Sequence, residues 1–237
     1  MLELVAGKSH LVIDPQGAWV TEWSHDGRPV LYSRRELTTA SGETKTRGGM
    51  HVCLPNFGPG GDSGLAQHGF GRTTEWVVTL SERSRVVLQL SCNNEISYAG
   101  CVCTLTYGLG DGLWSATLHV ANNGTLPARF APAFHPYFAL SDGTPAVRVN
   151  TGFYDLMSLE DTVFIEENDV TLTTTSGSIY LSQQQLSTWA IWTDQLGDYV
   201  CVEPTYGGNR FLLPAQPDEL LAPGEEREWG MRVGARD

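Results

Sequence analysis

The chain has 237 residues, of which 41% are hydrophobic and 18% are charged, so it carries enough apolar material for a large globular core. Its formal net charge of -12 argues against nucleic acid or an anionic membrane surface as a partner, because both require a basic face on the protein. A small anionic substrate is still allowed, since a few arginines can make one site locally positive.

The N-terminus and the cysteines predict where the protein works. Residues 1–16, MLELVAGKSHLVIDPQ, lack the basic, apolar and small-residue order of a secretory signal peptide, and no apolar run approaches the length of a bilayer span. The five cysteines are an odd number and are expected to be reduced thiols. Cys101 and Cys103 have no second Cys or His pair at zinc spacing, so no metal site is expected. We therefore expect a cytoplasmic protein that does not bind a membrane.

Short β-prone segments bounded by Gly, Pro, Asn, Asp and Ser recur along the chain. In chain order they are residues 10–13, 18–22, 75–80, 85–91, 101–107, 113–120, 128–134, 147–150, 170–175, 188–193, 199–203 and 228–233. In residues 113–120, Trp114, Ala116 and Leu118 alternate with more polar residues. No long segment has a helical period, and the residues around Leu186 are expected to form at most one short turn. The pattern predicts an antiparallel β-sandwich or barrel, organised as a single domain over residues 1–237.

Two segments interrupt this series of strands, residues 38–74 and 204–223. Both are rich in glycine and proline, which favour turns and close approaches of the backbone. Connections this long inside a compact domain are usually functional. We therefore expect the two segments to cover one end or face of a sheet and to enclose a pocket there.

One histidine lies in an apolar run, FAPAFHPYFAL, at residues 130–140. Pro132 and Pro136 lack a backbone N–H, so a strand that contains them is expected at a sheet edge, a bulge or a rim. His135 is then either a buried structural histidine or a group at a functional site that changes its charge near pH 7. This run alone leaves both interpretations open.

A second group of polar residues lies in the first irregular segment. His68 and Arg72 belong to QHGFGR and Arg47 belongs to TRGG, so all three have glycines nearby. A single loop arginine is usually a solvated surface residue. Two arginines and a histidine in one glycine-rich region instead predict a hydrogen-bonding cluster for hydroxyls, a carboxylate or a phosphate.

Two carboxylates follow β-prone segments later in the chain. Glu203 has the same strand phase as Cys201, so both side chains are expected on one face. A carboxylate at the inner end of a strand is costly unless it is paired or used in a reaction. The alternative for Glu203 is an edge residue that reaches solvent or pairs with Arg210. Asp194 ends the segment WAIWTD, and its alternative is a turn-forming role.

Together these segments resemble the aldose 1-epimerase (mutarotase) family. The matching pieces occur in the order of that family and cover most of the chain: RGGMHVCLPNFG, QHGFGRTTEW, FHPYFAL and CVEPTYGGNRFLLPAQPDELLAPGEEREWGMRV. The first piece resembles the glucose-6-phosphate 1-epimerase branch more than the galactose mutarotases. The resemblance implies a large antiparallel β-sandwich, the galactose mutarotase-like supersandwich, with the sugar lying across a concave sheet face.

The resemblance also implies that His135 is the general acid and Glu203 the general base of a sugar 1-epimerase. Interconversion of anomers requires a base that removes the proton of the C1 hydroxyl and an acid that protonates the ring oxygen. A carboxylate and an imidazole serve because both titrate within reach of neutral pH. No metal, nucleotide or covalent intermediate is needed, so no cofactor is expected.

The remaining matched residues imply a binding site for a small-molecule sugar or sugar phosphate. His68 and Arg72 resemble residues that orient the substrate near the anomeric carbon. Arg47, with Arg72, resembles a binding site for an anionic substituent, and Asp194 is implied to hold sugar hydroxyls. We expect the protein to be a monomer or a weak homodimer. Aromatic surface for stacking on the sugar is expected from Phe70, Trp76, Phe134 and Tyr137, although such a stripe is more often core.

Two positions depart from the family pattern. Asn56 stands in LPNFG where the branch usually has an aromatic residue, and Met50 with His51 replaces a short apolar residue followed by proline. His51 alternates with its neighbours in a β-prone segment and is interpreted as structural. These departures leave the identity of the sugar and the preference for phosphate open.

Two other functions are open at this point. A binding protein could keep the sugar cleft without turnover. A glycosidase would need two carboxylates on either side of the bond, and Asp194 and Glu203 are the pair that the sequence offers. The presence of both an acid and a base favours the epimerase.

Overall fold

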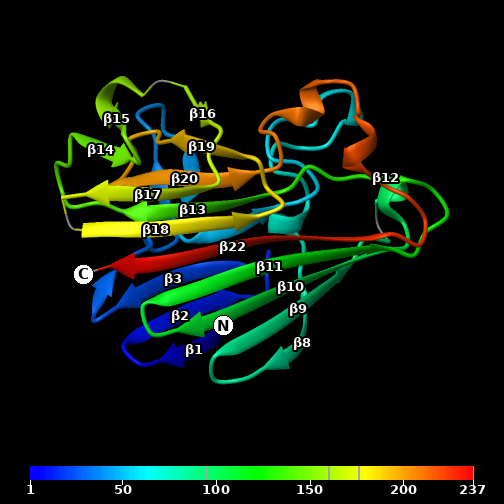
Figure 1. The fold of residues 1–237 in the computed structure, drawn as a ribbon, viewed down its shortest axis with the longest axis horizontal. Coiled ribbons are helices and arrows are strands. Elements are labelled where there is room, and N and C mark those ends of the chain that lie inside the picture. The colour runs from blue at the N-terminus through cyan, green and yellow to red at the C-terminus, as the bar shows by residue number, and fades with distance from the viewer. Residues whose placement is uncertain (94, 160, 176, 237) are drawn as a thin grey trace.

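The computed structural model describes residues 1–93, 95–159, 161–175 and 177–236, which form an all-β fold (Figure 1). Its strands build two large antiparallel sheets, so the predicted antiparallel β-sandwich is confirmed. Helical structure in the described residues is limited to short 3₁₀ turns: η1 (Gly61–Ser63), η2 (Gly71–Thr73), η3 (Ile96–Tyr98), η4 (Leu156–Ser158), η5 (Arg210–Leu212) and η6 (Pro217–Glu219). None of these turns has the length or the apolar character that a bilayer-spanning helix requires.

The first sheet has nine strands in the order β1-β2-β3-β7-β13-β20-β19-β16, with β4 paired to β3. They are β1 (Leu2–Ala6), β2 (Ser9–Asp14), β3 (Trp19–His25), β4 (Arg28–Pro29), β7 (Met50–Cys53), β13 (Ala133–Ala139), β16 (Val163–Ile165), β19 (Thr188–Trp192) and β20 (Tyr199–Thr205). The chain returns to this sheet from distant segments, which brings β7, β13 and β20 together at its centre.

The second sheet also has nine strands, in the order β15-β14-β17-β18-β22-β11-β10-β9-β8. They are β8 (Val77–Ser81), β9 (Arg85–Ser91), β10 (Cys101–Gly110), β11 (Leu113–Asn122), β14 (Ala146–Val149), β15 (Gly152–Asp155), β17 (Asp169–Thr174), β18 (Gly177–Gln184) and β22 (Glu226–Arg236). Two small ribbons complete the described strands: β5 (Arg35–Thr38) with β6 (Thr44–Arg47), and β12 (Ala128–Arg129) with β21 (Leu220–Leu221).

The main core takes alternate residues from the strands of both sheets. On β11, Trp114, Ala116 and Leu118 are buried, as the alternation in the sequence predicts. Val52 of β7 and Phe134 of β13 belong to the same core cluster from the side of the first sheet. Removal of these apolar side chains from water is the main force that holds the two sheets together.

The central strands β7, β13 and β20 are buried on both faces, apart from the last residue of β13. One face of each strand joins the main core, whereas the other face carries two smaller apolar clusters outside it. The first consists of Cys53, Phe57, Ala133 and Ala190, and the second of Tyr137, Tyr199 and Cys201. The outer face of the first sheet is therefore covered as well, and loops provide the cover.

Some sequence expectations differ from the structure. The segment 128–134 is divided between β12 and β13, and β13 is a central strand, so of the three expected positions (edge, bulge or rim) the edge is excluded. The missing N–H of Pro136 is tolerated because the pairing of β13 with β20 is interrupted between Ala133 and Tyr137. The short turn expected around Leu186 and the glutamines before it is wrong for Gln183 and Gln184, because both belong to β18.

The segment 38–74 is more regular than expected, because β6 and β7 lie within it. Its irregular part is residues 54–74, which contain only η1 and η2 as named elements. Residues 206–219 contain η5 and η6 and lie beside this first loop (Figure 1). The two loops touch so closely that a Cβ atom on Gly61 would lie 2.4 Å from the carbonyl oxygen of Phe211. Together they form the cover that the sequence predicts.

A buried carboxylate fixes the second loop. Glu219 has 0% exposure and forms ion pairs with Arg129, at 2.6 Å, and with Arg210. The guanidinium of Arg129 also lies over the ring of Phe211, 4.3 Å from its centroid. Because a buried charge without a partner is strongly unfavourable, these contacts determine where residues 206–219 cross the sheet.

Replacing Glu219 by Gln should lower the free energy of unfolding by about 2 kcal/mol, because both arginines lose their buried partner. Urea unfolding followed by tryptophan fluorescence measures this change. The control is Glu226→Gln, since Glu226 pairs with His119 at the surface and should change stability by less than about 0.5 kcal/mol. Equal effects of the two substitutions would contradict the role given to Glu219.

Candidate active site

Side chains from three adjacent strands meet in one row on the outer face of the first sheet. Strand β7 sets His51 directly opposite His135 of β13. The register between β13 and β20 pairs Tyr137 with Cys201, which places Glu203 opposite His135. Since side chains alternate along a strand, Glu203 lies on the same face as Cys201, as its strand phase predicts.

His135 and Glu203 are in contact and almost completely buried. Nε2 of His135 lies 3.3 Å from Oε2 of Glu203, and the two residues are 3% and 1% exposed. This separation is within ion-pair distance, but it does not have the geometry of a hydrogen bond. Oε2 of Glu203 and Nδ1 of His135 have no hydrogen-bond partner among the described residues. The structure thus brings the two residues together with unused hydrogen-bonding capacity.

The environment of the pair favours the neutral form of each group. Burial raises the pKa of Glu203 well above its usual range. Burial also lowers the pKa of His135, and the nearby His68 and Arg72 lower it further. Since one group resists losing a proton and the other resists gaining one, the two groups together are expected to hold a single proton near neutral pH.

Aromatic rings hold the imidazole of His135 in place. Tyr137 stacks on it with centroids 4.7 Å apart and an interplanar angle of 17°, and Trp192 meets it edge-on at 6.1 Å. The ring of His51 lies 4.7 Å away on the side of β7 and is itself fully buried. His51, interpreted from the sequence as structural, therefore packs directly against the predicted acid.

His68 reaches the pair from the loop 54–74. A Cβ atom on Gly69 would lie 2.1 Å from the carbonyl oxygen of Leu54, so only glycine lets this loop pass the end of β7. The ring of His68 then lies edge-on to His135, with centroids 5.0 Å apart. Its Nδ1 is 3.4 Å from Sγ of Cys53. The glycines of QHGFGR thus position a histidine against the first sheet.

A cavity of about 610 Å³ opens in front of this row. Its volume lies within the range of small-molecule sites, roughly 300–1,000 Å³. Five of the six residues predicted for the site line it: Arg47, His68, Arg72, His135 and Glu203. Their individual roles are still predictions, but the structure places them around one hollow.

Asp194, the sixth predicted residue, lies behind the wall of the cavity. Its Oδ2 accepts a hydrogen bond from Nε of Arg47 at 2.8 Å, and its Oδ1 accepts one from the hydroxyl of Tyr199. Asp194 is not among the described residues that line the cavity. In this structure its carboxylate positions Arg47.

The two predicted arginines differ in their electrostatic state. Arg47 is neutralised by Asp194, whereas Arg72 forms no ion pair in the described part of the chain and donates only a 3.4 Å hydrogen bond to the carbonyl of Gln67. Lys45 also lines the cavity and pairs with Glu43. Arg72 is therefore the positive charge at this cavity that has no counter-ion among the described residues.

Sequence reasoning missed several residues of the cavity and misplaced others. Of the four aromatic residues expected to stack on a sugar, Tyr137 lines the cavity, whereas Trp76 and Phe134 are in the main core and Phe70 packs against it. The lining also includes residues that the sequence analysis did not select: Lys45, Phe57, Trp192 and Asn209. Trp192 could have been found from strand phase. It lies two residues after Ala190, which pairs with Glu203, so its side chain is on the face that carries Glu203.

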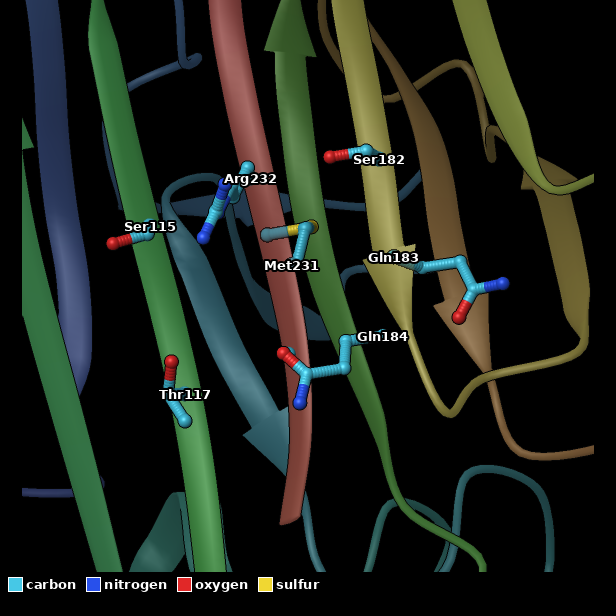
Figure 2. A pocket seen from close by; sticks show the side chains of 8 residues that line it. Ser115, Thr117, Ser182, Gln183, Gln184, Met231 and Arg232 are labelled. Carbon is cyan, nitrogen blue, oxygen red and sulfur yellow. The ribbon is translucent and has the colours of Figure 1, made fainter.

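Figure 2 shows a second hollow, of about 310 Å³, on the outer face of the second sheet. Ser115 and Thr117 come from β11, Ser182 and Gln184 from β18, and Arg232 from β22. Its described lining contains no histidine and no carboxylate, so it has no acid and base pair. We therefore place the candidate active site on the first sheet.

One set of metal-ligand residue types comes together in the described part of the chain. Donor atoms of His135, Cys201 and Glu203 all lie within 4.8 Å of one another. The expectation of no metal site used the spacing of cysteines and histidines along the sequence, which does not detect donors from two separate strands. The arrangement offers one nitrogen, one sulfur and one oxygen donor at the same point.

Comparison with known proteins identifies a family that matches most of the chain. The sequence model of the family described as aldose 1-epimerase matches residues 1–161. A curated protein of Escherichia coli (strain K12), named "Putative glucose-6-phosphate 1-epimerase", is 35% identical over 63 residues. That match spans 27% of this chain and 21% of the curated protein, so the chain covers about a fifth of its length.

Solved structures are similar to the chain over nearly its whole length. A galactose mutarotase related enzyme from Lactobacillus acidophilus has a TM-score of 0.79 and 17% identity, and the alignment covers 99% of this chain and 97% of that one. A galactose mutarotase-like protein from Lactobacillus casei ATCC 334 has a TM-score of 0.78 and 18% identity, with both chains covered completely. At these identities the likeness establishes the fold, which is the expected galactose mutarotase-like sandwich.

Replacing His68 by Asn should make the protein less sensitive to acid. Burial, with Arg72 adding to it, lowers the pKa of His68 to about 3 in the folded protein, from an ordinary value of 6.5. The unfolded chain therefore binds one more proton than the folded chain between these two pH values. The stability that depends on neutral His68 is complete above pH 6.5 and is lost as the pH falls.

In this pH window the wild type should lose about 1.4 kcal/mol more stability per pH unit than the His68→Asn variant. Urea unfolding at a series of pH values, in buffer containing EDTA, measures the two slopes. His10→Asn, at a position whose side chain is 41% exposed, is the control for replacing a histidine by asparagine. Parallel profiles for the wild type and His68→Asn would show that His68 does not contribute to acid sensitivity.

Proposed function

This chain belongs to the aldose 1-epimerase family, and we propose that it interconverts the α and β anomers of a hexose or a hexose 6-phosphate, with His135 and Glu203 as the catalytic pair. The observation that carries the proposal is the 3.3 Å contact between these two groups in the wall of a sugar-sized cavity. Among the described residues that line this cavity, no other acid and base form a buried pair at ion-pair distance, since Lys45 and Glu43 are partly exposed.

The proposed reaction moves two protons and leaves the pair as it began. One member of the pair accepts the proton of the C1 hydroxyl while the other donates its proton to the ring oxygen, and the C1–ring oxygen bond breaks. The open aldehyde rotates about its C1–C2 bond and closes on the opposite face with both transfers reversed. The family resemblance assigns the acceptor to Glu203 and the donor to His135. These roles need the proton of the pair on His135, whereas burial favours it on Glu203, so the proposal includes its transfer across the 3.3 Å contact before the sugar reacts.

The remaining wall of the cavity suits a sugar. Tyr137, Trp192 and Phe57 provide flat apolar surface for the C–H face of a pyranose ring. His68 offers a ring nitrogen, and Arg72 a guanidinium, for sugar hydroxyls. In this proposal they orient the ring so that C1 faces the catalytic pair.

The more specific part of the proposal is that the sugar carries an anionic substituent. The cavity presents Arg72 without a counter-ion, although the whole chain has a net charge of -12. Arg47 is held by Asp194, so in this proposal it is a fixed wall of the site and Arg72 is the principal contact of a 6-phosphate.

The glycosidase alternative has less support. It needs Asp194 and Glu203 on either side of a scissile bond, but both oxygens of Asp194 already accept hydrogen bonds, from Arg47 and Tyr199. Asp194 also lies outside the described lining of the cavity. A sugar-binding protein without turnover is the remaining alternative, and the first experiment below separates it from the epimerase.

Glu203→Gln and His135→Asn should each reduce the rate of anomer exchange by about 10²- to 10⁴-fold, because each replaces one proton-transfer group by an amide that does not titrate. Polarimetry and NMR exchange spectroscopy with glucose, galactose and glucose 6-phosphate measure the rate, and circular dichroism verifies the fold. The controls are Glu36→Gln and His119→Asn, since both residues lie outside the cavity and should leave the rate unchanged.

Two results would overturn this assignment. Full activity in both Glu203→Gln and His135→Asn would show that other groups transfer the protons. Calorimetric binding of a sugar by a wild type that does not accelerate anomer exchange would establish the binding protein instead.

Arg72→Gln should raise the KM for a hexose 6-phosphate by about 10- to 100-fold, the loss expected for one charge-assisted contact. The KM for the unphosphorylated hexose should change by less than about 3-fold, because a hydroxyl contact contributes less. Anomer-exchange kinetics with the two substrates measure the difference. Arg83→Gln, at an exposed position outside the cavity, is the matched control. Equal increases for both substrates would remove Arg72 as the phosphate contact.

A further inference from the structure

The contact between His135 and Glu203 has a feature that proton transfer alone does not explain. Nε2 and Oε2 face each other at 3.3 Å without forming a hydrogen bond, and Oε2 has no partner among the described residues. Cys201, two places before Glu203 on β20, adds a thiol, and one donor atom from each of the three residues lies within 4.8 Å of the other two. A nitrogen, an oxygen and a sulfur donor therefore lie close together at one place on the first sheet.

The spacing of the nitrogen and the oxygen matches that of two ligands of a small tetrahedral cation. Zinc binds imidazole nitrogen and carboxylate oxygen at roughly 2.0–2.2 Å, so two such ligands lie about 3.4 Å apart at a tetrahedral angle. The separation of Nε2 and Oε2 is 3.3 Å. The thiol of Cys201 is the third donor of this group.

The donor set selects the type of ion. Thiolate and imidazole ligands favour Zn²⁺ and similar ions over Mg²⁺ and Ca²⁺, which prefer oxygen ligands. Three protein ligands leave a fourth position open, as in zinc sites that exchange water. His135 and Glu203 line the cavity, so this position faces the space where a sugar is proposed to bind.

We propose that His135, Cys201 and Glu203 form a Zn²⁺ site, and that Zn²⁺ bound there inhibits the enzyme by replacing the proton of the catalytic pair. Zinc binds the thiolate and the ionised carboxylate, so the shared proton and the proton of the thiol pass to solvent. With both His135 and Glu203 bound to the metal, neither is free to exchange protons with the sugar. The inhibition rests on the proposed function, whereas the binding of the ion does not.

Cys53 is the competing thiol at this site. Its Sγ lies 3.4 Å from Nδ1 of His68 and 3.8 Å from Nδ1 of His51. These contacts are already hydrogen-bonding distances for a thiol, and they include no carboxylate. Cys53→Ala is therefore the matched control for Cys201→Ala, because both remove one buried thiol from the same face of the sheet.

Binding is tested first, without any sugar. The full-length protein, freed of metal with a chelator, should bind one Zn²⁺ per chain in equilibrium dialysis. Co²⁺ in place of Zn²⁺ should give the near-ultraviolet band of thiolate-to-cobalt charge transfer. In Cys201→Ala this band should disappear and the affinity for Zn²⁺ should fall at least 10-fold, the smallest loss typical even for an outer partner of a metal ligand. Cys53→Ala should keep both the charge-transfer band and the affinity for Zn²⁺.

The outcomes of this test separate the two proposals. A Co²⁺ spectrum of the wild type without a thiolate band, or loss of Zn²⁺ binding in Cys53→Ala and not in Cys201→Ala, would overturn the metal site. In the second step, Zn²⁺ should stop anomer exchange by the wild type and EDTA should restore it. Anomer exchange unaffected by a bound Zn²⁺ would overturn the inhibition. Binding of Zn²⁺ by a protein that shows no exchange even in its metal-free form would overturn the proposed function alone.

Discussion

The burial of a carboxyl group next to an imidazole is the constraint on which the rest of this structure depends. Glu203 is 1% exposed, so it has lost almost all of its hydration, and that loss raises its pKa. The fold provides such an environment because β13 and β20 are central strands. The main core covers their inner face, and loops cover their outer face. On an edge strand the same two groups would be solvated, and their pKa values would return toward the ordinary range.

Strands and loops contribute different parts of the site. His135 and Glu203 project from paired strands, whose register fixes the distance between them. His68 and Arg72 come from the loop 54–74, which is held against β7 by the close approach of Gly69 to Leu54. The loop 206–219 is anchored at some distance from the cavity by the ion pairs of Glu219. The pair thus stands on paired strands, whereas the rest of the cavity wall comes largely from loops.

Much of the fold follows from local patterns in the sequence, and less of the site does. Alternation correctly identified the inward residues of β11 and the shared face of Cys201 and Glu203, because side-chain period is a local property. The central position of β13 was not predictable from its prolines, since the interruption in its pairing with β20 depends on tertiary structure. The meeting of His135 with Glu203 could be expected only from the family resemblance. Strand register between residues so far apart is set by packing and not by either segment. The hydrogen bond between Arg47 and Asp194, and the position of Cys201 near His135 and Glu203, are likewise set by packing between distant segments.

The enclosure of the pair also bears on how hydrogen ions travel during turnover. With His135 and Glu203 3% and 1% exposed, both acidic protons of the proposed cycle stay among the sugar and these two side chains. Each ring opening is followed by a ring closure that reverses both proton transfers, so the proposed cycle takes no proton from the surrounding solution. Dissolved buffer ions would then have no step to assist, and catalysis would proceed at the same speed whatever the identity or concentration of the buffer at a given pH.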